Sequence, residues 1–188
     1  MEVGLREEEE LTTPKEELNC EHMPDFYYQL IIYPLIYVFP AYVANGAPVI
    51  FGGGLPIDLN KKISGKPIFG SHKTIRGLVA GLLAGFILAY FESIFIPYML
   101  VVGILLSIGT HFGDLLGSLI KRRIGTREGV SMPFLDQYLF LLFAFIFSFP
   151  LGNLPSWYGI LFIVILTGLL HKGTNIAAYL MKLKKVPW

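Results

Sequence analysis

Two aspartates, Asp114 and Asp136, interrupt stretches of sequence that are otherwise apolar. A charged side chain in a membrane segment costs about 2.5 to 3.5 kcal/mol by the lower estimates, so a functional role is the default interpretation. One short segment joins the two apolar runs, so both carboxylates can face one pocket at the membrane surface. Mg²⁺ prefers oxygen ligands and commonly combines one or two carboxylates with substrate phosphates. The pair predicts a magnesium site, with a proton relay as the alternative.

Cations follow the first aspartate at helical spacing. If the helix that carries Asp114 continues past the membrane, Ser118 and Lys121 lie on the same face at i+4 and i+7. Arg122 and Arg123 come next. A metal-binding carboxylate beside cations suits a polyphosphate, because the metal bridges oxygens while Lys and Arg neutralise charge on a leaving pyrophosphate. Basic clusters at helix ends are also ordinary topology signals, so this prediction depends on Asp114.

A further phosphate contact is predicted where an earlier helix begins. Lys73, Thr74 and Arg76 stand at the start of an apolar run. Backbone N–H groups at a helix N-terminus attract phosphate, and a flanking Lys and Thr would strengthen such a site. His111 lies one turn before Asp114, where a hydrogen-bonded structural role is at least as common as a functional one.

Membrane helices must position these residues. Of 188 residues, 54% are hydrophobic and 15% are charged, and the mean hydropathy is +0.59, outside the usual range of soluble domains. Several uncharged runs reach the roughly 20 residues that span a bilayer. We expect an all-α polytopic integral membrane protein with five transmembrane helices and a polar active site at its cytoplasmic face. The expected helices are residues 26–43, 74–91, 93–116, 132–149 and 156–179.

The segments outside these runs differ in character. Residues 1–25 are acidic and have no apolar run, which predicts a mobile tail ahead of a single transmembrane catalytic domain, residues 26–188. Residues 45–73 are rich in Gly, Pro and polar groups and predict an aqueous or re-entrant loop. Residues 118–131 predict a second, basic loop. The single Cys20 excludes an internal disulfide.

Glycines recur every four residues in the second and third expected helices. In lipid, such faces let helix backbones approach closely, so we expect these two helices to be central rather than lipid-facing. The two series are Gly77, Gly81, Gly85 and Gly109, Gly113, Gly117.

Basic residues orient the chain. Five spans put the two predicted loops and the C-terminal end on one side, and these segments with their adjoining helix ends contain every Lys and Arg except Arg6 and Lys15. The positive-inside rule assigns that side to the cytoplasm. We expect a multi-pass protein of the cell membrane whose active site faces the cytoplasm and whose N-terminus is outside.

The segment around Asp114 resembles the signature of the membrane CTP:phosphatidate cytidylyltransferases. The matching residues, in order, are Gly113-Asp114, Ser118, Lys121-Arg122, Arg127-Glu128 and Asp136. Lys73-Thr74-Ile75-Arg76-Gly77 is similar to the Lys-Thr-x-x-Gly segment of that family. The chain is short, lacks a His-Gly-Gly stretch before Asp136 and has Gln137 where Arg is usual. These departures resemble the archaeal branch, the CDP-archaeol synthases, as do residues 44–48 and 65–70.

The resemblance implies transfer of CMP from CTP to the phosphate of an isoprenoid ether lipid, 2,3-bis-O-(geranylgeranyl)glycerol 1-phosphate, with release of pyrophosphate. It implies Mg²⁺ on the two aspartates, with K⁺ beside it. Lipid phosphate, CTP and membrane lipid are the expected partners; no nucleic acid is expected, and the oligomeric state is open, a homodimer included. The candidate catalytic residues are Asp114, Asp136, Lys121 and Arg122, and the candidate substrate contacts are Asn45, Lys73, Thr74, Arg76, Ser118 and Arg123.

Three alternatives stay open at this point. A bacterial-type CDP-diacylglycerol synthase would act on a diacyl phosphate instead. A small proton- or cation-coupled transporter would place its ionisable groups near the bilayer midplane, whereas here they cluster beside cations at the predicted cytoplasmic face. A CDP-alcohol phosphotransferase would need several aspartates in one short motif, and this sequence has no such cluster.

Overall fold

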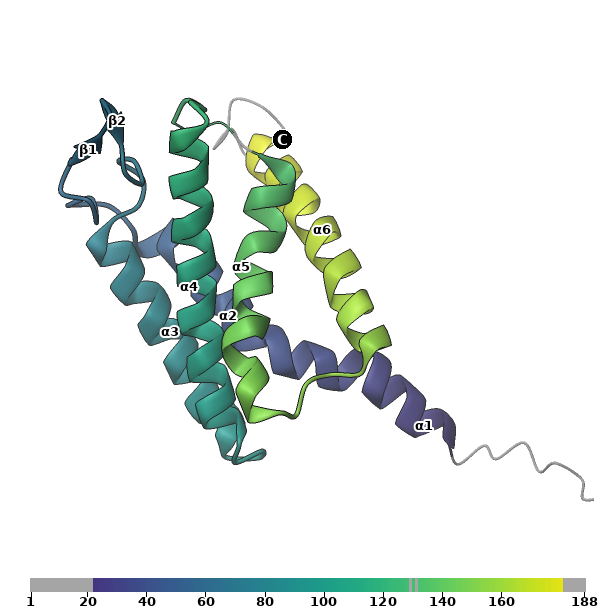
Figure 1. Cartoon of the computed structure of the whole chain (residues 1–188). Coiled ribbons are helices and arrows are strands. Elements are labelled where there is room, and N and C mark those ends of the chain that lie inside the picture. The colour runs from purple at the N-terminus through teal and green to yellow at the C-terminus, as the bar shows by residue number, and fades with distance from the viewer. Residues whose placement is uncertain (1–21, 129, 131, 181–188) are drawn as a thin grey trace, which may run out of the picture.

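A computed structural model describes residues 22–128, 130 and 132–180 of the chain. The expected tail is therefore described only from residue 22, and residues 1–21 lie outside the described part. The described residues are mostly helical (Figure 1). The helices are α1 (His22–Tyr27), α2 (Tyr33–Phe51), α3 (Ile75–Ser93), α4 (Met99–Arg123), α5 (Pro133–Ser148) and α6 (Trp157–Leu180), with a π-helical turn at Tyr28–Ile32 and a 3₁₀ turn at Phe149–Leu151.

Five stretches of helix in the described part are long and apolar enough to cross a membrane, which confirms the predicted number. A bilayer core offers no water to unpaired backbone groups, so spanning segments keep their hydrogen bonds internal by forming helices. The stretches are Asp25–Phe51, Ile75–Ser93, Met99–Arg123, Phe134–Leu151 and Trp157–Ile176.

The ends of several helices differ from the predictions. The first span continues to Phe51, so Asn45 lies inside a helix and not in a loop. Apolar surroundings favour continued backbone pairing despite Gly and Pro, and the helix ends where Gly53 and Gly54 adopt positive φ angles of 105° and 82°. At its other end, helix already begins at His22, four residues before the predicted start.

Both ends of the third predicted helix also differ from the prediction. Turns occupy residues 94–98, and α4 begins at Met99 instead of residue 93. Pro97 cannot donate a backbone hydrogen bond, which suits the turn just before a helix. The same helix runs on to Arg123, so the second loop is shorter than predicted and begins at Ile124.

The glycine faces carry the closest helix contacts. A Cβ atom on Gly81 of α3 would lie 2.3 Å from the His111 ring on α4, and one on Gly113 would lie 2.4 Å from the Leu139 carbonyl oxygen on α5. The predicted packing of these faces is confirmed. The prediction that both helices are central is right for α4 and wrong for α3, because the outer face of α3 exposes Val79, Leu83 and Ile87 by about half.

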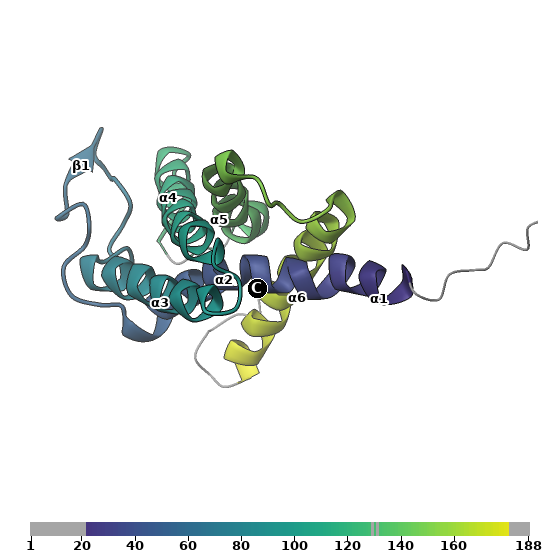
Figure 2. The ribbon, with the colours of Figure 1, turned by 90° about the horizontal axis from the view of Figure 1, so that it is seen from below.

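The core lies where α2, α4, α5 and α6 meet. Tyr37, Leu106 and Ile163 are fully buried there. One polar group there is paired across two helices, because the Tyr37 hydroxyl donates to Ser148 Oγ at 2.9 Å. Helix α6 is inclined to α5 in both views (Figures 1 and 2), so the two helices diverge from one another instead of packing along their length.

One end of the bundle carries most of the polar structure. Residues 52–74, here called the hairpin loop, contain the antiparallel strands β1 (Lys62–Ile63) and β2 (Lys66–Pro67). Figure 1 shows this loop beside the C-terminal end of α4, at the same end as the start of α5. We call this the hairpin end. The predicted aqueous or re-entrant loop is therefore an ordered hairpin.

Candidate active site

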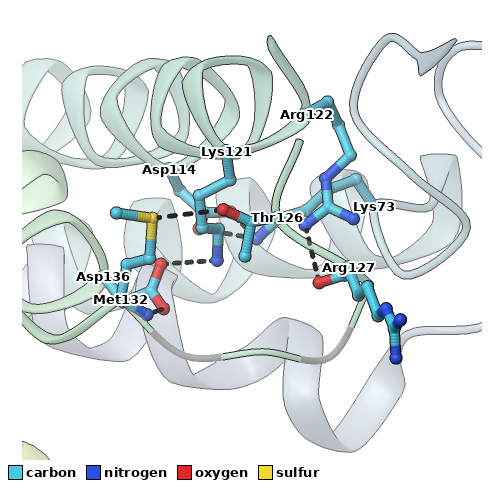
Figure 3. A network of polar contacts seen from close by, with 8 residues as sticks. All are labelled: Lys73, Asp114, Lys121, Arg122, Thr126, Arg127, Met132 and Asp136. Atoms are coloured by element: carbon cyan, nitrogen blue, oxygen red, sulfur yellow. Dashed lines mark hydrogen bonds and ion pairs between the residues drawn. The ribbon is translucent and has the colours of Figure 1, made fainter. Parts of the chain in front are cut away.

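Two lysine–aspartate pairs lie at the hairpin end. Lys73 Nζ, just before α3, is 2.6 Å from both carboxylate oxygens of Asp114 on α4. Lys121 Nζ, on the last turn of α4, is 2.6 Å from Asp136 Oδ1 on α5. All four side chains are partly buried. Figure 3 shows both pairs, so each of the two predicted carboxylates meets one of the two predicted lysines.

The second aspartate is also held by its own helix. Asp136 lies in the first turn of α5, and its Oδ2 accepts a hydrogen bond of 2.9 Å from the Met132 backbone N–H. This N–H has no partner within the helix, so the carboxylate satisfies it and complements the positive end of the helix dipole. Asp136 therefore presents one oxygen to Lys121 and keeps the other on the backbone.

Arg122 is buried beside these pairs with few partners. It is 7% exposed, and within the described residues its guanidinium makes one hydrogen bond, a 3.3 Å contact from Nη2 to the Arg127 carbonyl oxygen. Its Nε finds no partner among the described residues. A buried guanidinium can donate five hydrogen bonds and is costly when they are unmade. The arrangement leaves Arg122 with free donors for an anion.

Arg123, in contrast, makes several hydrogen bonds, although its Nε, like that of Arg122, has no partner among the described residues. Its guanidinium donates to the backbone carbonyls of Ile63, Lys66 and Pro67 in the hairpin loop. The Lys66 ammonium donates back to the Arg123 carbonyl at 3.0 Å. These contacts fasten the hairpin to the end of α4, and the substrate contact predicted for Arg123 stays a prediction.

The residues predicted around the start of α3 take different places. Thr74 is the N-cap of this helix, and its hydroxyl accepts from the Gly77 and Gly53 N–H groups, each at 3.1 Å. The Gly77 N–H, one of the backbone groups that the sequence predicted to bind phosphate, is therefore occupied by the cap. Arg76 is exposed and lines an apolar groove with Phe51 and Val79, apart from the Lys73–Asp114 pair.

The two remaining candidates lie on helices. Ser118 is 5% exposed on α4, one turn after Asp114 and on the face that the spacing predicted. Asn45 is half-buried within α2. Its neighbour Ala44 lies where α2, α3 and α4 cross, because its carbonyl oxygen would be 2.6 Å from a Cβ on Gly81. Within the described part of the chain, neither side chain makes a hydrogen bond to the lysine–aspartate pairs.

Two carboxylates for which the sequence predicted no function hold the loops in place through hydrogen bonds. Glu128 Oε2 accepts from both the backbone N–H and the hydroxyl of Ser71. The Ser71 hydroxyl, together with the charge of Arg122, holds the pKa of Glu128 below its ordinary value, although burial opposes them. The Arg127-Glu128 pair in the sequence motif could have marked Glu128 as a candidate, but the sequence does not reveal that Ser71 is its partner.

Asp58 is the second of these carboxylates. It is 7% exposed and accepts hydrogen bonds from the N–H groups of Asn60, Phe69 and Gly70. Burial alone would raise the pKa of Asp58, but these backbone donors outweigh it and hold the pKa below its ordinary value. Asp58 thereby closes the hairpin loop on itself.

An apolar groove runs along α5, between α5 and α6. Its volume is about 750 Å³, and it begins at Phe134 and Leu135, next to Asp136 in sequence. It continues to Phe149 at the other end of α5. The remaining lining side chains are Tyr138, Leu139, Leu141, Leu142, Phe145, Ile146, Leu154, Ile160 and Val164.

Comparison with known proteins gives a consistent result. A family model described as "CarS-like: CDP-archaeol synthase" matches residues 27–188. The CDP-archaeol synthase of Pyrococcus furiosus is 43% identical over 159 residues, covering 81% of this chain and 95% of the relative. That of Methanococcus maripaludis strain C7 is 43% identical over 174 residues, covering 85% and 97%.

A solved structure is also similar to this chain. It is described as "Structural insight into an intramembrane enzyme for archaeal membrane lipids biosynthesis". The two share 33% sequence identity with a TM-score of 0.73, over 78% of this chain and 94% of the other. The likeness therefore extends over most of both chains.

Proposed function

Because the chain belongs to the CDP-archaeol synthase family, whose members are membrane cytidylyltransferases of archaeal lipid biosynthesis, we propose that its site transfers CMP from CTP to a lipid phosphate. Its substrates are CTP and a lipid phosphate. In the proposed reaction, an oxygen of the lipid phosphate attacks the α-phosphorus of CTP. A bond forms between them, the bond from the α-phosphorus to the bridging oxygen breaks, and pyrophosphate leaves with that oxygen.

The arrangement that carries the proposal is the pair of aspartates on adjacent helices, each facing a lysine from a different segment. Both substrates are anions, and the attack brings two phosphates together. The ammonium groups of Lys73 and Lys121 would offset that repulsion by donating to phosphate oxygens. No general base is needed, because a phosphate oxygen is already anionic at neutral pH.

Arg122 is the third cation of the proposed site. Its burial and its unmade hydrogen bonds favour a role in binding an anion over a role in folding. A planar guanidinium matches phosphate oxygens with two parallel donors. We assign Arg122 to the triphosphate, where it would neutralise charge that develops on the leaving pyrophosphate.

The donor set suits magnesium. No group of three or more His, Cys, Asp or Glu side chains within the described residues is placed to hold a metal. A metal at this site would therefore depend on Asp114 and Asp136 together with substrate oxygens and water, which is the combination Mg²⁺ commonly takes. When bound, it would gather the phosphates of both substrates and stabilise their charge. The K⁺ ion implied by the sequence resemblance stays a prediction.

The groove between α5 and α6 supports a lipid as the acceptor. It is lined by apolar side chains and begins at Phe134 and Leu135, which precede Asp136 in the sequence. A lipid whose phosphate lies at the hairpin end can extend an isoprenoid chain along this groove within the bilayer. Together with the positive-inside bias of the sequence, this supports a hairpin end that faces the cytoplasm.

A transfer assay tests the proposed function. Purified protein is incubated with labelled CTP, Mg²⁺ and either a bis-geranylgeranyl ether phosphate or a diacyl phosphatidic acid. We expect labelled CDP-lipid and pyrophosphate, with the ether lipid preferred by a graded margin, because apolar differences discriminate by only about 1 to 3 kcal/mol each. The dephosphorylated lipid should be inert. A preference for the diacyl lipid, or no product at all, would contradict the proposal.

A further inference from the structure

A single carboxylate joins the two loops at the hairpin end. Glu128, in the segment after α4, accepts from the Ser71 N–H at 3.3 Å and also from the Ser71 hydroxyl. Gly70 packs against the same side chain: a Cβ there would lie 3.2 Å from Glu128 Oε1, and its φ of +100° suits glycine. The 57 positions between Ser71 and Glu128 make this a tertiary contact and not a local turn.

This contact lies two residues from Lys73. The Lys73 N–H donates to the Gly70 carbonyl at 3.2 Å, and the Lys73 carbonyl accepts from the Ile57 N–H at 2.8 Å. The backbone of Lys73 is thus tied directly to Gly70, which rests on Glu128. A displacement of Ser71 would move the Lys73 side chain relative to Asp114.

Other contacts hold other parts of the loop. Asp58 binds the N–H groups of Phe69 and Gly70, but Asp58 belongs to the same loop and cannot fix it to α4. Arg123 fixes residues 63–67 to the end of α4. Among the hydrogen bonds of the described residues, only those to Glu128 join Ser71 to a segment outside the hairpin loop.

We propose that Glu128 is a positioning residue for the nucleotide site: through Ser71 it fixes the segment that presents Lys73 to Asp114. This inference rests on the proposed function, in which Lys73 contacts the triphosphate. Glu128 itself touches no reacting atom in this account. Its negative charge also interacts with the charge of Arg122, a second cation assigned to phosphate.

The consequence is specific to nucleotide binding. If the Lys73 segment is displaced, CTP binds less well, because part of the binding energy must order the segment again. Once CTP is saturating, the chemistry proceeds with the same groups. The proposal therefore predicts a raised KM for CTP with little change in kcat.

The test is a set of variants measured for CTP binding by calorimetry with Mg²⁺, for KM and kcat, and for melting temperature. Glu128→Ala removes the acceptor and the charge, and we expect it to weaken CTP binding by about tenfold, the loss typical of a hydrogen bond to a charged group. Glu128→Gln keeps one oxygen that can accept from Ser71, so its affinity for CTP should lie between those of wild type and Glu128→Ala. kcat at saturating CTP should stay within about twofold for both.

A double variant tests whether Ser71 is the connection. Ser71→Ala should weaken CTP binding by less than Glu128→Ala, because its backbone N–H still donates. If Ser71 acts through Glu128, the double variant should bind CTP no worse than Glu128→Ala alone. Matched controls are Ser64→Ala, an exposed serine at the tip of the same loop, and Asp25→Asn, an exposed carboxylate outside it. Both should bind CTP like wild type.

The outcomes separate this inference from the proposed function. If wild-type protein does not bind CTP, the proposed function is wrong. If wild type binds CTP and Glu128→Ala binds it equally well while its melting temperature falls, the contact serves folding alone and the inference is wrong. Additive losses in the double variant would also contradict it, since Ser71 and Glu128 would then act independently.

Discussion

Lys73 Nζ lies 2.6 Å from both carboxylate oxygens of Asp114, although 41 positions separate the two residues. The contact joins the residue before the N-cap of α3 to the middle of α4 (Figure 3). A lysine in this position can turn from the carboxylate to phosphate oxygens by rotating its side chain. The pair therefore links the fold of the hairpin loop to the proposed binding of CTP.

Replacing Lys73 with methionine keeps the aliphatic stem and removes the charge. We expect Lys73→Met to weaken CTP binding by about 10- to 100-fold, because a charge-assisted hydrogen bond to phosphate is lost. Calorimetric titration with CTP measures the effect. Lys61→Met, an exposed lysine in the same loop, is the control and should bind as wild type does. Equal affinities for the two variants would remove Lys73 from the site.

Arg122→Met should separate activity from stability. The side chain is buried with one weak hydrogen bond, so an apolar residue of similar length should leave the melting temperature unchanged or raise it. Transfer activity should fall by about 100-fold, the cost of an electrostatic donor at a reacting centre. Arg122→Lys should recover only part of it, because lysine lacks the planar fork. A lower melting temperature with normal activity would assign Arg122 to folding.

Gly81→Ala tests the closest contact between α3 and α4. The added Cβ would lie 2.3 Å from the His111 ring and 2.6 Å from the Ala44 carbonyl oxygen, and the backbone atom cannot move aside. Overpacking of this kind costs about 1 to 3 kcal/mol, so the melting temperature should fall. Gly46→Ala in α2 meets nothing within 4 Å and should be neutral or stabilising. Similar behaviour of the two variants would contradict the packing described.

Acid should loosen the hairpin loop through Asp58. Its pKa is held below the ordinary value of 3.8 in the folded protein, so its stabilising effect is complete above that value and is lost as the pH falls through the lower, folded pKa. Asp58→Asn should melt at a lower temperature than wild type near pH 7, and the difference should shrink on acidification toward pH 3. Thermal melts across this range measure it, with Asp25→Asn as control. A difference that does not change with pH would show that the charge of Asp58 is not involved.

The sequence predicts the helices of this fold better than their ends. Long uncharged runs specify five spans because lipid leaves a backbone few alternatives. The end of α2 was misplaced because Asn45, Gly46 and Pro48 usually mark a turn in water, whereas here the helix continues to Phe51.

The candidate site was partly predictable. Asp114, Ser118 and Lys121 could be put on one face because helical spacing alone determines it. The partners could not: Lys73 reaches Asp114, and Ser71 reaches Glu128, only because a β-hairpin returns the chain to the end of α4. Thr74 was predicted to contact phosphate, whereas it caps α3 in the structure. Capping and anion binding use the same backbone N–H groups, so the sequence alone does not distinguish the two roles.

We propose that Asp114 and Asp136 form one cation-binding pair on which CMP transfer depends. Asparagine keeps the shape of either side chain and removes its charge. The deciding measurement is the rate of CDP-lipid formation from CTP and a geranylgeranyl ether phosphate by Asp114→Asn and Asp136→Asn, with melting temperatures to show that both variants are folded. We predict that each loses nearly all activity and that EDTA abolishes the activity of wild type. Retention of more than about a tenth of the wild-type rate by either folded variant would contradict the account, since even a residue that only supports a metal ligand costs roughly 10- to 100-fold when it is lost.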